Sequence, residues 1–340
     1  MIDEDLEPPS FEFGRGRRDR EPEDPPPREP GPEYAEEEPF EEPFEEPFEE
    51  PEIIVRRGGE GEDRGARRGL GKLIPEMSET TARIVVAIPW IIFAIAIVAA
   101  GGLVFTIAIV VLAILGLREF FRMAEPEQPI MLPAYAVVAG MVIAAHYGSA
   151  FQILLVFAAI FPLAFAFAAA RRSHEAITIS IAMTILGVAW MGIGFSHAVL
   201  LRDLPLHGGA LLIDVLVATF IHDTAAYAAG RLFGSRKITP RISPNKTLEG
   251  AIGGFIGATL GFWFAGLYQD WLPGTDALLM GMAIGVIAPI GDLFASLIKR
   301  DLGVKDTGRL FGPHGGLIDR LDAVLFTVVV GYYLSVAFVY

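Results

Sequence analysis

The sequence contains no cysteine. This absence excludes disulfide bonds, thiolate nucleophiles and cysteine-based zinc or iron–sulfur sites. The chemistry left open is that of carboxylates, imidazoles and metals bound through oxygen. Long apolar runs are also absent from the N-terminal part, since the first one starts near Ile84. A cleavable signal peptide has its apolar core at the extreme N-terminus, so we expect none.

The N-terminal part is acidic in a way that the rest of the chain is not. Residues 1–82 hold 26 Asp and Glu against 11 Lys and Arg, whereas residues 83–340 hold 15 against 16. The formal net charge of −14 therefore belongs to the N-terminal part. It says nothing about the partners of the remaining sequence.

A low-complexity composition marks residues 1–76, which are rich in Pro, Glu, Arg and Gly. They include the tandem repeat PFEEPFEEPFEEPE, from Pro39 to Glu52. Such a segment cannot bury enough apolar area to offset the entropy lost on ordering. We predict a disordered cytoplasmic tail over residues 1–76 and a polytopic transmembrane catalytic domain over residues 77–340. Docking of a partner by the spaced phenylalanines of the repeat is an alternative.

Apolar stretches recur from Ile84 onward, each about long enough to span a hydrocarbon core of roughly 30 Å. About nine are present, which predicts an all-α integral membrane protein, a bundle of transmembrane helices. The second and third are short or interrupted by Pro133, so eight or ten spans are alternatives. The predicted spans run approximately over residues 84–100, 103–117, 130–146, 151–170, 176–201, 209–229, 248–269, 277–298 and 321–340.

Basic residues test this count, because they collect in the cytoplasmic loops of membrane proteins. With the N-terminal tail in the cytoplasm, the outward breaks contain a single basic residue, Arg202. The two large polar loops, residues 231–247 and 299–320, both fall on the cytoplasmic side. We therefore predict a multi-pass protein of the cell membrane with its site at the cytoplasmic face. The inward basic residues are Arg118, Arg122, Arg171, Arg172, Arg231, Arg236, Lys237, Arg241, Lys246, Lys299, Arg300, Lys305, Arg309 and Arg320.

Carboxylates flank the second of these loops. Asp292, Ser296 and Lys299 are spaced so that they share one face of a helix. Asp319 and Asp322 follow at the start of the last span. Two helix ends that present Asp292 and Asp319 toward each other would suit a divalent ion, since Mg²⁺ takes oxygen ligands and leaves room for phosphate.

Cationic side chains in the same stretch supply the positive charge that a polyphosphate needs. The alternative is that these residues are juxtamembrane charges with local counter-ions. That alternative is weaker for Asp292, because an unpaired Asp at the end of a long apolar run costs a few kcal/mol. His314 either contacts phosphate or base, or only holds a glycine-rich turn. The cations are Lys299, Arg300, Lys305, Arg309 and Arg320.

The sixth predicted span contains His222 and Asp223 within apolar sequence. Asp223 approaches the same membrane boundary as Asp292, so it is a candidate to join the metal or orient a substrate. The alternative is a structural pair with His222 or with a basic residue of the following loop. Asp214 lies nearer the outer end of this span, and we interpret it as interfacial or paired.

The loop after this span ends in SPNKT, from Ser243 to Thr247. Either Ser243 or Thr247 is placed to cap the following helix. Lys246 near a helix N-terminus is unfavourable for the helix dipole but useful for an anion bound there.

These residues resemble the signature of CDP-diacylglycerol synthases, also called phosphatidate cytidylyltransferases. The pattern S-x2-K-R-x4-K-D-x-G-x3-G-x-H-G-G-x2-D-R-x-D, from Ser296 to Asp322, is unbroken. Upstream, D-x2-A-Y-x2-G from Asp223 and S-P-x-K-T-x-E-G from Ser243 are similar to a second motif of that family. Three features depart from it: the acidic tail, Ala225 and Asn245.

The resemblance covers roughly residues 83–340 and implies that CTP and phosphatidate give CDP-diacylglycerol and pyrophosphate in phospholipid biosynthesis. It implies a divalent ion, Mg²⁺ or similar, with Asp292 and Asp319 as ligands, and it suggests a homodimer. It implies no nucleic-acid partner. The residues assigned to catalysis are Lys299, Arg300, Lys305, Asp306, Arg320 and Asp322, and those assigned to substrate binding are Ser296, Lys246, Ser243, Asp223, Tyr227 and His314.

Two other functions are alternatives. A related membrane transferase would use CTP on another lipid phosphate or on a polyprenol. A transporter or ion channel would use the intramembrane carboxylates as an ion path. Against the transporter, the charges lie at one face rather than at the midplane, and no repeat relates the two halves of the span pattern.

Overall fold

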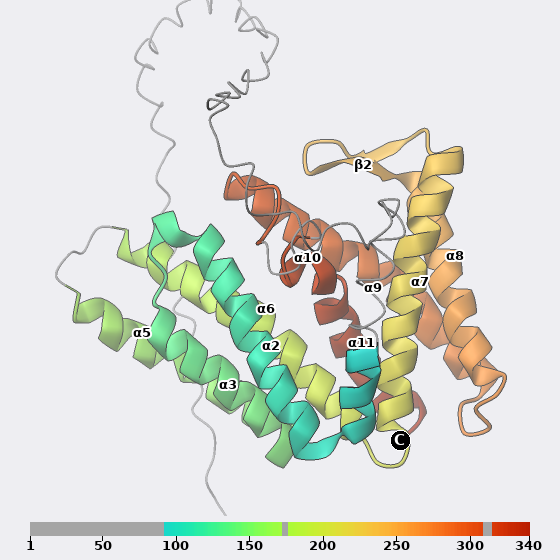
Figure 1. Ribbon diagram of the computed structural model, residues 1–340, viewed down its shortest axis with the longest axis horizontal. Helices are drawn as coiled ribbons and strands as arrows, with labels where there is room; N and C mark the ends of the chain where they lie inside the picture. The colour runs from blue at the N-terminus through green and yellow to red at the C-terminus, as the bar shows by residue number, and fades with distance from the viewer. Residues whose placement is uncertain (1–91, 172–175, 309–314) are drawn as a thin grey trace, which may run out of the picture. The chain divides into compact units, whose positions relative to one another are not determined.

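The computed structural model describes residues 92–171, 176–308 and 315–340 (Figure 1). The predicted tail with its phenylalanine repeat, the start of the first predicted span, Arg309 and His314 lie outside the described residues. The three described segments contain every predicted span after the first.

The described chain is almost entirely helical, with one antiparallel hairpin, as expected where backbone groups must be satisfied without water. Residues 92–100 are helical as well. The elements are α2 (Gly102–Met123), η1 (Glu125–Glu127), α3 (Met131–Tyr147), α4 (Ala150–Ala158), α5 (Ile160–Ala169), α6 (Ile177–Arg202), α7 (Gly208–Phe233), β1 (Lys237–Thr239), β2 (Ser243–Thr247), α8 (Leu248–Gly266), α9 (Gly274–Asp301), α10 (Ile318–Leu321) and α11 (Val324–Phe338).

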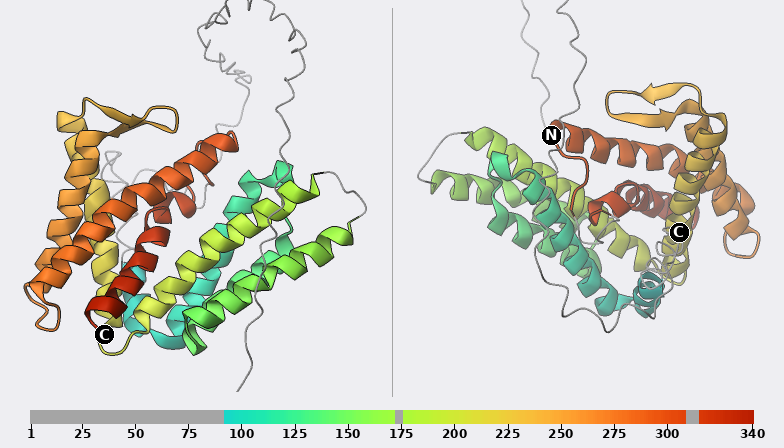
Figure 2. Two further views of the ribbon diagram at one scale, coloured as in Figure 1. Left: turned by 180° about the vertical axis from the view of Figure 1, so that it is seen from behind. Right: turned by 45° about the horizontal axis from the view of Figure 1, so that its top comes forward.

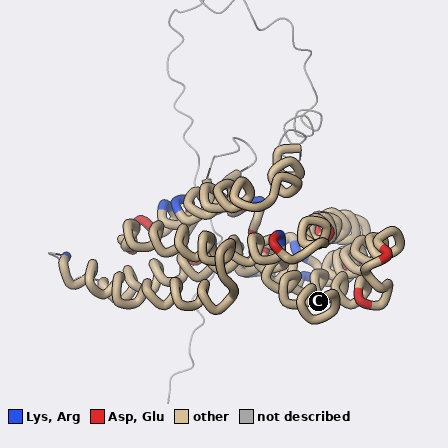
Figure 3. Tube along the Cα trace, turned by 90° about the horizontal axis from the view of Figure 1, so that it is seen from below, with Lys and Arg blue, Asp and Glu red and all other residues tan. Residues whose placement is uncertain are grey.

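Seven helical segments among the described residues are long and apolar enough to cross a membrane. The pairs α4–α5 and α10–α11 each count as one of them, and α3 is a shorter apolar helix. Charged positions are sparse along the helical trace in Figure 3. Large apolar side chains such as Leu132 and Phe165 are each 70% exposed, which suits contact with lipid rather than water. The protein is an integral membrane protein built from helices.

The helices agree with the predicted spans, with two corrections. Each predicted span after the first corresponds to one helix or to two consecutive helices. The expectation that the second span is short is wrong, because α2 has 22 residues. Pro133 does not interrupt the third, because it lies in the first turn of α3, where a missing backbone N–H costs no hydrogen bond.

Two groups of helices meet through α11 and through a direct contact between α6 and α7. In the first, α3 packs against α2, α4 and α6; in the second, α8 packs between α7 and α9. Helix α11 contacts α6 of the first group and both α7 and α9 of the second. Both views of Figure 2 show α9 running obliquely past α11 toward the hairpin end.

Glycines allow α7 and α8 to approach closely. A Cβ atom at Gly257 would lie 2.6 Å from the Cβ of Ala225, and one at Gly250 would lie 2.9 Å from the carbonyl oxygen of Ala226. Small residues at such contacts are typical of helices packed inside membranes. This close packing fixes the position of Asp223, which lies in the half of α7 that leads into the β1–β2 hairpin.

Candidate active site

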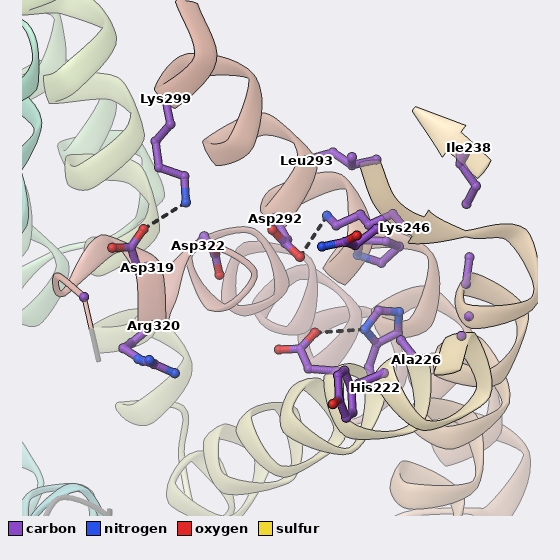
Figure 4. A pocket seen from close by; sticks show the side chains of 18 of the residues that line it. His222, Ala226, Ile238, Lys246, Asp292, Leu293, Lys299, Asp319, Arg320 and Asp322 are labelled. Atoms are coloured by element: carbon purple, nitrogen blue, oxygen red, sulfur yellow. Dashed lines mark hydrogen bonds and ion pairs between the residues drawn. The ribbon is translucent and has the colours of Figure 1, made fainter. Parts of the chain in front are cut away.

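A polar cavity of about 1410 Å³ opens between α7, the β1–β2 hairpin, α9 and α10 (Figure 4). It lies where several helices end or begin, so backbone turns and charged side chains meet there. Its polar lining residues are His222, Asp223, Tyr227, Arg231, Asn245, Lys246, Thr247, Asp292, Lys299, Lys305, Asp306, Asp319, Arg320 and Asp322.

Two lysine–aspartate ion pairs span the cavity. Lys246 Nζ lies 2.8 Å from Asp292 Oδ2, joining the hairpin to α9. Lys299 Nζ lies 2.8 Å from Asp319 Oδ1, joining α9 to α10. Figure 4 shows both pairs pointing into the same space. Ammonium and carboxylate groups thus lie side by side on this wall, as expected for a site that handles both anions and cations.

The carboxylate of Asp319 has several protein donors. Its Oδ2 accepts hydrogen bonds from Thr307 N at 2.9 Å, Thr307 Oγ1 at 3.0 Å and Gly316 N at 2.9 Å. Its other oxygen accepts from Lys299. Asp319 therefore ties the chain on both sides of residues 309–314 to the end of α9.

Asp322 lies between the two ion pairs in Figure 4. Its Oδ1 accepts a hydrogen bond from the backbone N of Ala323 at 2.8 Å, at the start of α11. The negative charges of Asp292 and Asp223 both act on it. Carboxylates from α7, α9 and the α10–α11 junction thus line the same cavity.

Helix α7 supplies the opposite wall. His222 Nδ1 lies 3.1 Å from Asp223 Oδ1, so the predicted alternative of a His222–Asp223 pair is present. His222 itself is only 3% exposed, whereas the side chain of Asp223 is 48% exposed and faces the cavity. One turn on, Arg231 donates a hydrogen bond to the hydroxyl of Tyr227 at 3.1 Å.

The spacing on α9 places its residues largely as expected. Ser296 Oγ lies 3.4 Å from Asp292 Oδ1, but Ser296 does not line the cavity. Lys299 points to Asp319 rather than back to Asp292. Arg300 also lies off the cavity, where its Nε donates to the carbonyl oxygen of Ile242 at 3.4 Å.

The hairpin and the start of α8 are held by local hydrogen bonds. Of the two predicted caps it is Thr247 that caps α8, since its hydroxyl accepts from Gly250 N at 3.1 Å. Ser243 lies in β2 and does not line the cavity. Glu249 accepts from Ser235 N and Oγ at 3.1 and 2.6 Å, which fixes the turn between α7 and β1. Lys246 is thereby presented to Asp292.

Most of the predicted site residues therefore lie around one cavity. Asp214 is elsewhere, and its carboxylate accepts hydrogen bonds from Gln269 Nε2 at 3.2 and 3.0 Å, so its interpretation as a paired group is confirmed. His314 is outside the described residues. The predicted residues that line the cavity are Asp223, Tyr227, Lys246, Asp292, Lys299, Lys305, Asp306, Asp319, Arg320 and Asp322, and those that do not are Ser243, Ser296 and Arg300.

Residues 81–338 match the Cytidylyltransferase family. The chain belongs to this family. A phosphatidate cytidylyltransferase of Synechocystis sp. is 32% identical over 75% of this chain and 96% of that relative. One of Haemophilus influenzae is 41% identical over 35% of this chain and 43% of the relative.

An uncharacterized protein of Escherichia coli, YnbB, is 42% identical over 44% of this chain and 53% of its own length. The matches to the Escherichia coli and Haemophilus influenzae proteins thus span about half of those relatives, whereas the Synechocystis match spans nearly all of its relative. Membership of the cytidylyltransferase family rests on the longer matches.

The divalent ion implied for this cytidylyltransferase family member can be tested against the donors present. Within residues 92–171, 176–308 and 315–340, no three acidic or histidine side chains form a metal-binding group. Mg²⁺, however, is usually bound by one or two carboxylates together with waters and substrate phosphates. The carboxylates in the cavity are donors of this kind, so they fit an ion that binds together with a nucleotide.

One residue near the site was missed by sequence reasoning. Glu119, near the end of α2, is 6% exposed and accepts a hydrogen bond from Ile318 N at 3.1 Å. In the sequence it stands beside Arg118 at the end of an apolar span, where charged residues are common. Nothing in its local pattern signals a partner that is far away in the chain.

Proposed function

We propose that this protein transfers the cytidylyl group of CTP to phosphatidate, giving CDP-diacylglycerol and pyrophosphate. Membership of the cytidylyltransferase family and relatives named phosphatidate cytidylyltransferase support this reaction. The observation on which it depends is the cavity at the polar end of the helices, where lysines, two arginines and several carboxylates converge. Such a lining suits two phosphate-bearing substrates and a divalent ion.

The reaction needs little proton transfer. An anionic oxygen of the phosphatidate phosphate attacks the α-phosphorus of CTP, and the bond between that phosphorus and the oxygen bridging to the β-phosphorus breaks. Pyrophosphate leaves with that electron pair. Catalysis then consists of bringing two anions together in line and stabilising the leaving group. This explains a site rich in cations that has no need of a nucleophile and base.

In this proposal the cations Lys246, Lys299, Lys305 and Arg320 hold the triphosphate and the lipid phosphate. Lys246 and Lys299 are paired with carboxylates 2.8 Å away, and both reach the cavity. Asp292 and Asp319 would hold the divalent ion, which when bound supplies positive charge against the phosphate oxygens. Tyr227 and Asp223, on the opposite wall, would contact the substrates.

We further propose that the cavity faces the cytoplasm in the cell membrane. CTP is a soluble nucleotide, whereas the phosphate of phosphatidate lies at the membrane surface. A cavity at the ends of the helices lets each substrate arrive from its own phase. The basic residues at this end and the single Arg202 between predicted spans at the other support the orientation. The acidic residues 1–76 are proposed as a tail outside the catalytic part, and a homodimer stays a prediction.

The proposal is tested with purified protein in detergent micelles that contain phosphatidate and are supplied with CTP. We expect CDP-diacylglycerol and pyrophosphate in equal amounts when Mg²⁺ is present, and none after chelation of divalent ions. A variant that lacks residues 1–76 should turn over at the same rate. Turnover that is absent with phosphatidate but present with another lipid phosphate or a polyprenyl phosphate would replace this function by the related transferase.

A further inference from the structure

Glu119 connects α2, at the start of the described chain, to the loop that precedes α10. Its Oε2 accepts a hydrogen bond from Ile318 N at 3.1 Å and lies 3.3 Å from Thr307 Oγ1. Thr307 is 5% exposed, so this contact is buried. Glu119 and Thr307 are 188 positions apart in the chain. Glu119 itself does not line the cavity.

Thr307 stands between two carboxylates. Its Oγ1 lies 3.0 Å from Asp319 Oδ2 and 3.3 Å from Glu119 Oε2. Asp319 in turn accepts a hydrogen bond from Lys299 Nζ at 2.8 Å. The single hydroxyl proton can serve only one carboxylate at a time, but Thr307 N also donates to Asp319 Oδ2 at 2.9 Å. With the hydroxyl donating to Glu119 and the backbone N–H to Asp319, Thr307 links α2 to Asp319 and so to the ammonium group of Lys299, which lines the cavity.

Two glycines of the Ser296–Asp322 motif make room for Glu119. A Cβ atom at Gly308 would lie 2.9 Å from Glu119 Oε1. A Cβ atom at Gly316 would lie 2.5 Å from Glu119 Oε2 and still nearer to Thr307 Oγ1. These contacts are closer than ordinary van der Waals distances. The glycines are therefore needed where the carboxylate of α2 approaches the loop backbone.

We propose that Glu119 is a positioning residue of the active site. It fixes Thr307 and Ile318, and through them it orients Asp319 so that Lys299 is directed into the cavity. The part of this inference that concerns catalysis rests on the proposed cytidylyl transfer. The part that concerns loop geometry stands on the hydrogen bonds alone.

A purely packing role would not require a carboxylate at this position. Burying a polar group is costly unless its hydrogen bonds are satisfied, and an ionised carboxylate is costlier still. An apolar side chain would suit a position that is only 6% exposed. The carboxylate of Glu119 is explained by its hydrogen bonds, which it accepts from Ile318 N–H and from the hydroxyl of Thr307.

The first experiment compares Glu119→Ala with Glu119→Gln in purified protein. The alanine variant loses both acceptors, and we expect kcat to fall roughly 10- to 100-fold, as for the loss of groups that orient a catalytic residue. The glutamine variant keeps an acceptor oxygen for Ile318 N–H, and we expect its kcat to stay within about threefold of the unaltered protein. Asp214→Ala is the matched control, because Asp214 is also 6% exposed but lies away from the cavity.

The second experiment does not depend on the substrate. Hydrogen–deuterium exchange of the backbone amides of Thr307, Gly316 and Ile318 should accelerate at least tenfold in Glu119→Ala and stay unchanged in Glu119→Gln and Asp214→Ala. This comparison tests loop positioning even if the protein proves to act on another lipid. If Glu119→Ala is too unstable to purify, Thr307→Val removes the same link from the other side, with the same expected losses.

Two results would overturn the inference. One is a folded Glu119→Ala or Thr307→Val protein whose kcat and whose rates of amide hydrogen–deuterium exchange equal those of the unaltered protein. The other is an equal loss of kcat in Asp214→Ala, which would show that any buried acid has the same effect. The protein could prove inactive on phosphatidate while Glu119→Ala still accelerates hydrogen–deuterium exchange of the loop amides. That result would sustain the positioning role and reject only the proposed reaction.

Discussion

At the scale of single residues, each carboxylate of the site binds a different partner. Asp292 forms an ion pair with Lys246, and Asp319 forms one with Lys299. Asp319 also accepts hydrogen bonds from the backbone before and after residues 309–314. Asp322 lies between the two ion pairs. Removing one member of such a pair leaves the other charge without its partner, which costs more than the pair contributes. Substituting one of these charged residues should therefore alter both the charge balance and the geometry of the site. An isosteric substitution changes the charge while keeping the size of the side chain, so it separates the two effects.

We expect Asp292→Asn or Asp319→Asn to lower turnover of CTP and phosphatidate by more than about 100-fold, since even groups behind metal ligands are worth 10- to 100-fold. The amide keeps the size of the side chain but not the charge that a divalent ion requires. Asp214→Asn is the control, because Asp214 bonds to Gln269 away from the cavity. Full activity in either of the first two variants would refute their assignment as ligands.

At the scale of elements, the second group of helices is held together by small residues. Gly257 of α8 faces Ala225 of α7, and Gly281 of α9 would place a Cβ atom 2.8 Å from the Cα of Thr259 in α8. Because α7 and α9 carry opposite walls of the cavity, the spacing of these helices sets the distance between Asp223 and Asp292. A change in how closely these helices pack should therefore also change the width of the cavity.

Gly257→Leu tests this dependence. A Cβ atom there would already lie 2.6 Å from the Cβ of Ala225, so the larger side chain must push the two helices apart. We expect a loss of about 1–3 kcal/mol in stability, as for overpacked cores, with a parallel loss of turnover. Thermal unfolding in detergent measures the first effect. The neighbouring Ile256→Leu should change neither, because Ile256 is 50% exposed.

The sequence predicts the elements of this protein better than their long-range contacts. Apolar length alone identified the spans, and helical spacing placed Asp292 near Ser296, because both are local properties of one segment. The hairpin was not foreseen, since its backbone pairing follows from no apolar pattern. The role of Glu119 was missed because its partners are set by how α2 packs, which a single span does not encode.

At the scale of the whole molecule, charge is distributed unequally between the two ends. The hairpin, the end of α9 and the start of α10 gather six lysines and arginines at the end with the cavity, whereas Arg202 stands at the other. The six are Lys237, Arg241, Lys246, Lys299, Arg300 and Arg320. At that other end the guanidinium of Arg202 bonds to the carbonyl oxygens of Val98 and Ala99, where it closes the end of the preceding helix. This asymmetry predicts the orientation in the bilayer.

The absence of cysteine allows a direct test of orientation, since single cysteines can be introduced without background. We choose Lys237→Cys in the hairpin and Thr275→Cys at the start of α9, both at exposed positions at opposite ends of the bundle. In intact cells a membrane-impermeant maleimide should label only the second, and both after permeabilisation. Labelling of the hairpin cysteine in intact cells would reverse the proposed topology.

The long separation between Glu119 and Thr307 has a consequence for biosynthesis. With 188 positions between them, a ribosome adding about 5–20 residues per second needs roughly 10–40 s to reach the second after the first. During that interval Glu119 has been synthesised, but its partners Thr307 and Ile318 have not. A chain stalled before α10 therefore leaves the carboxylate of Glu119 without its hydrogen bond from Ile318 N.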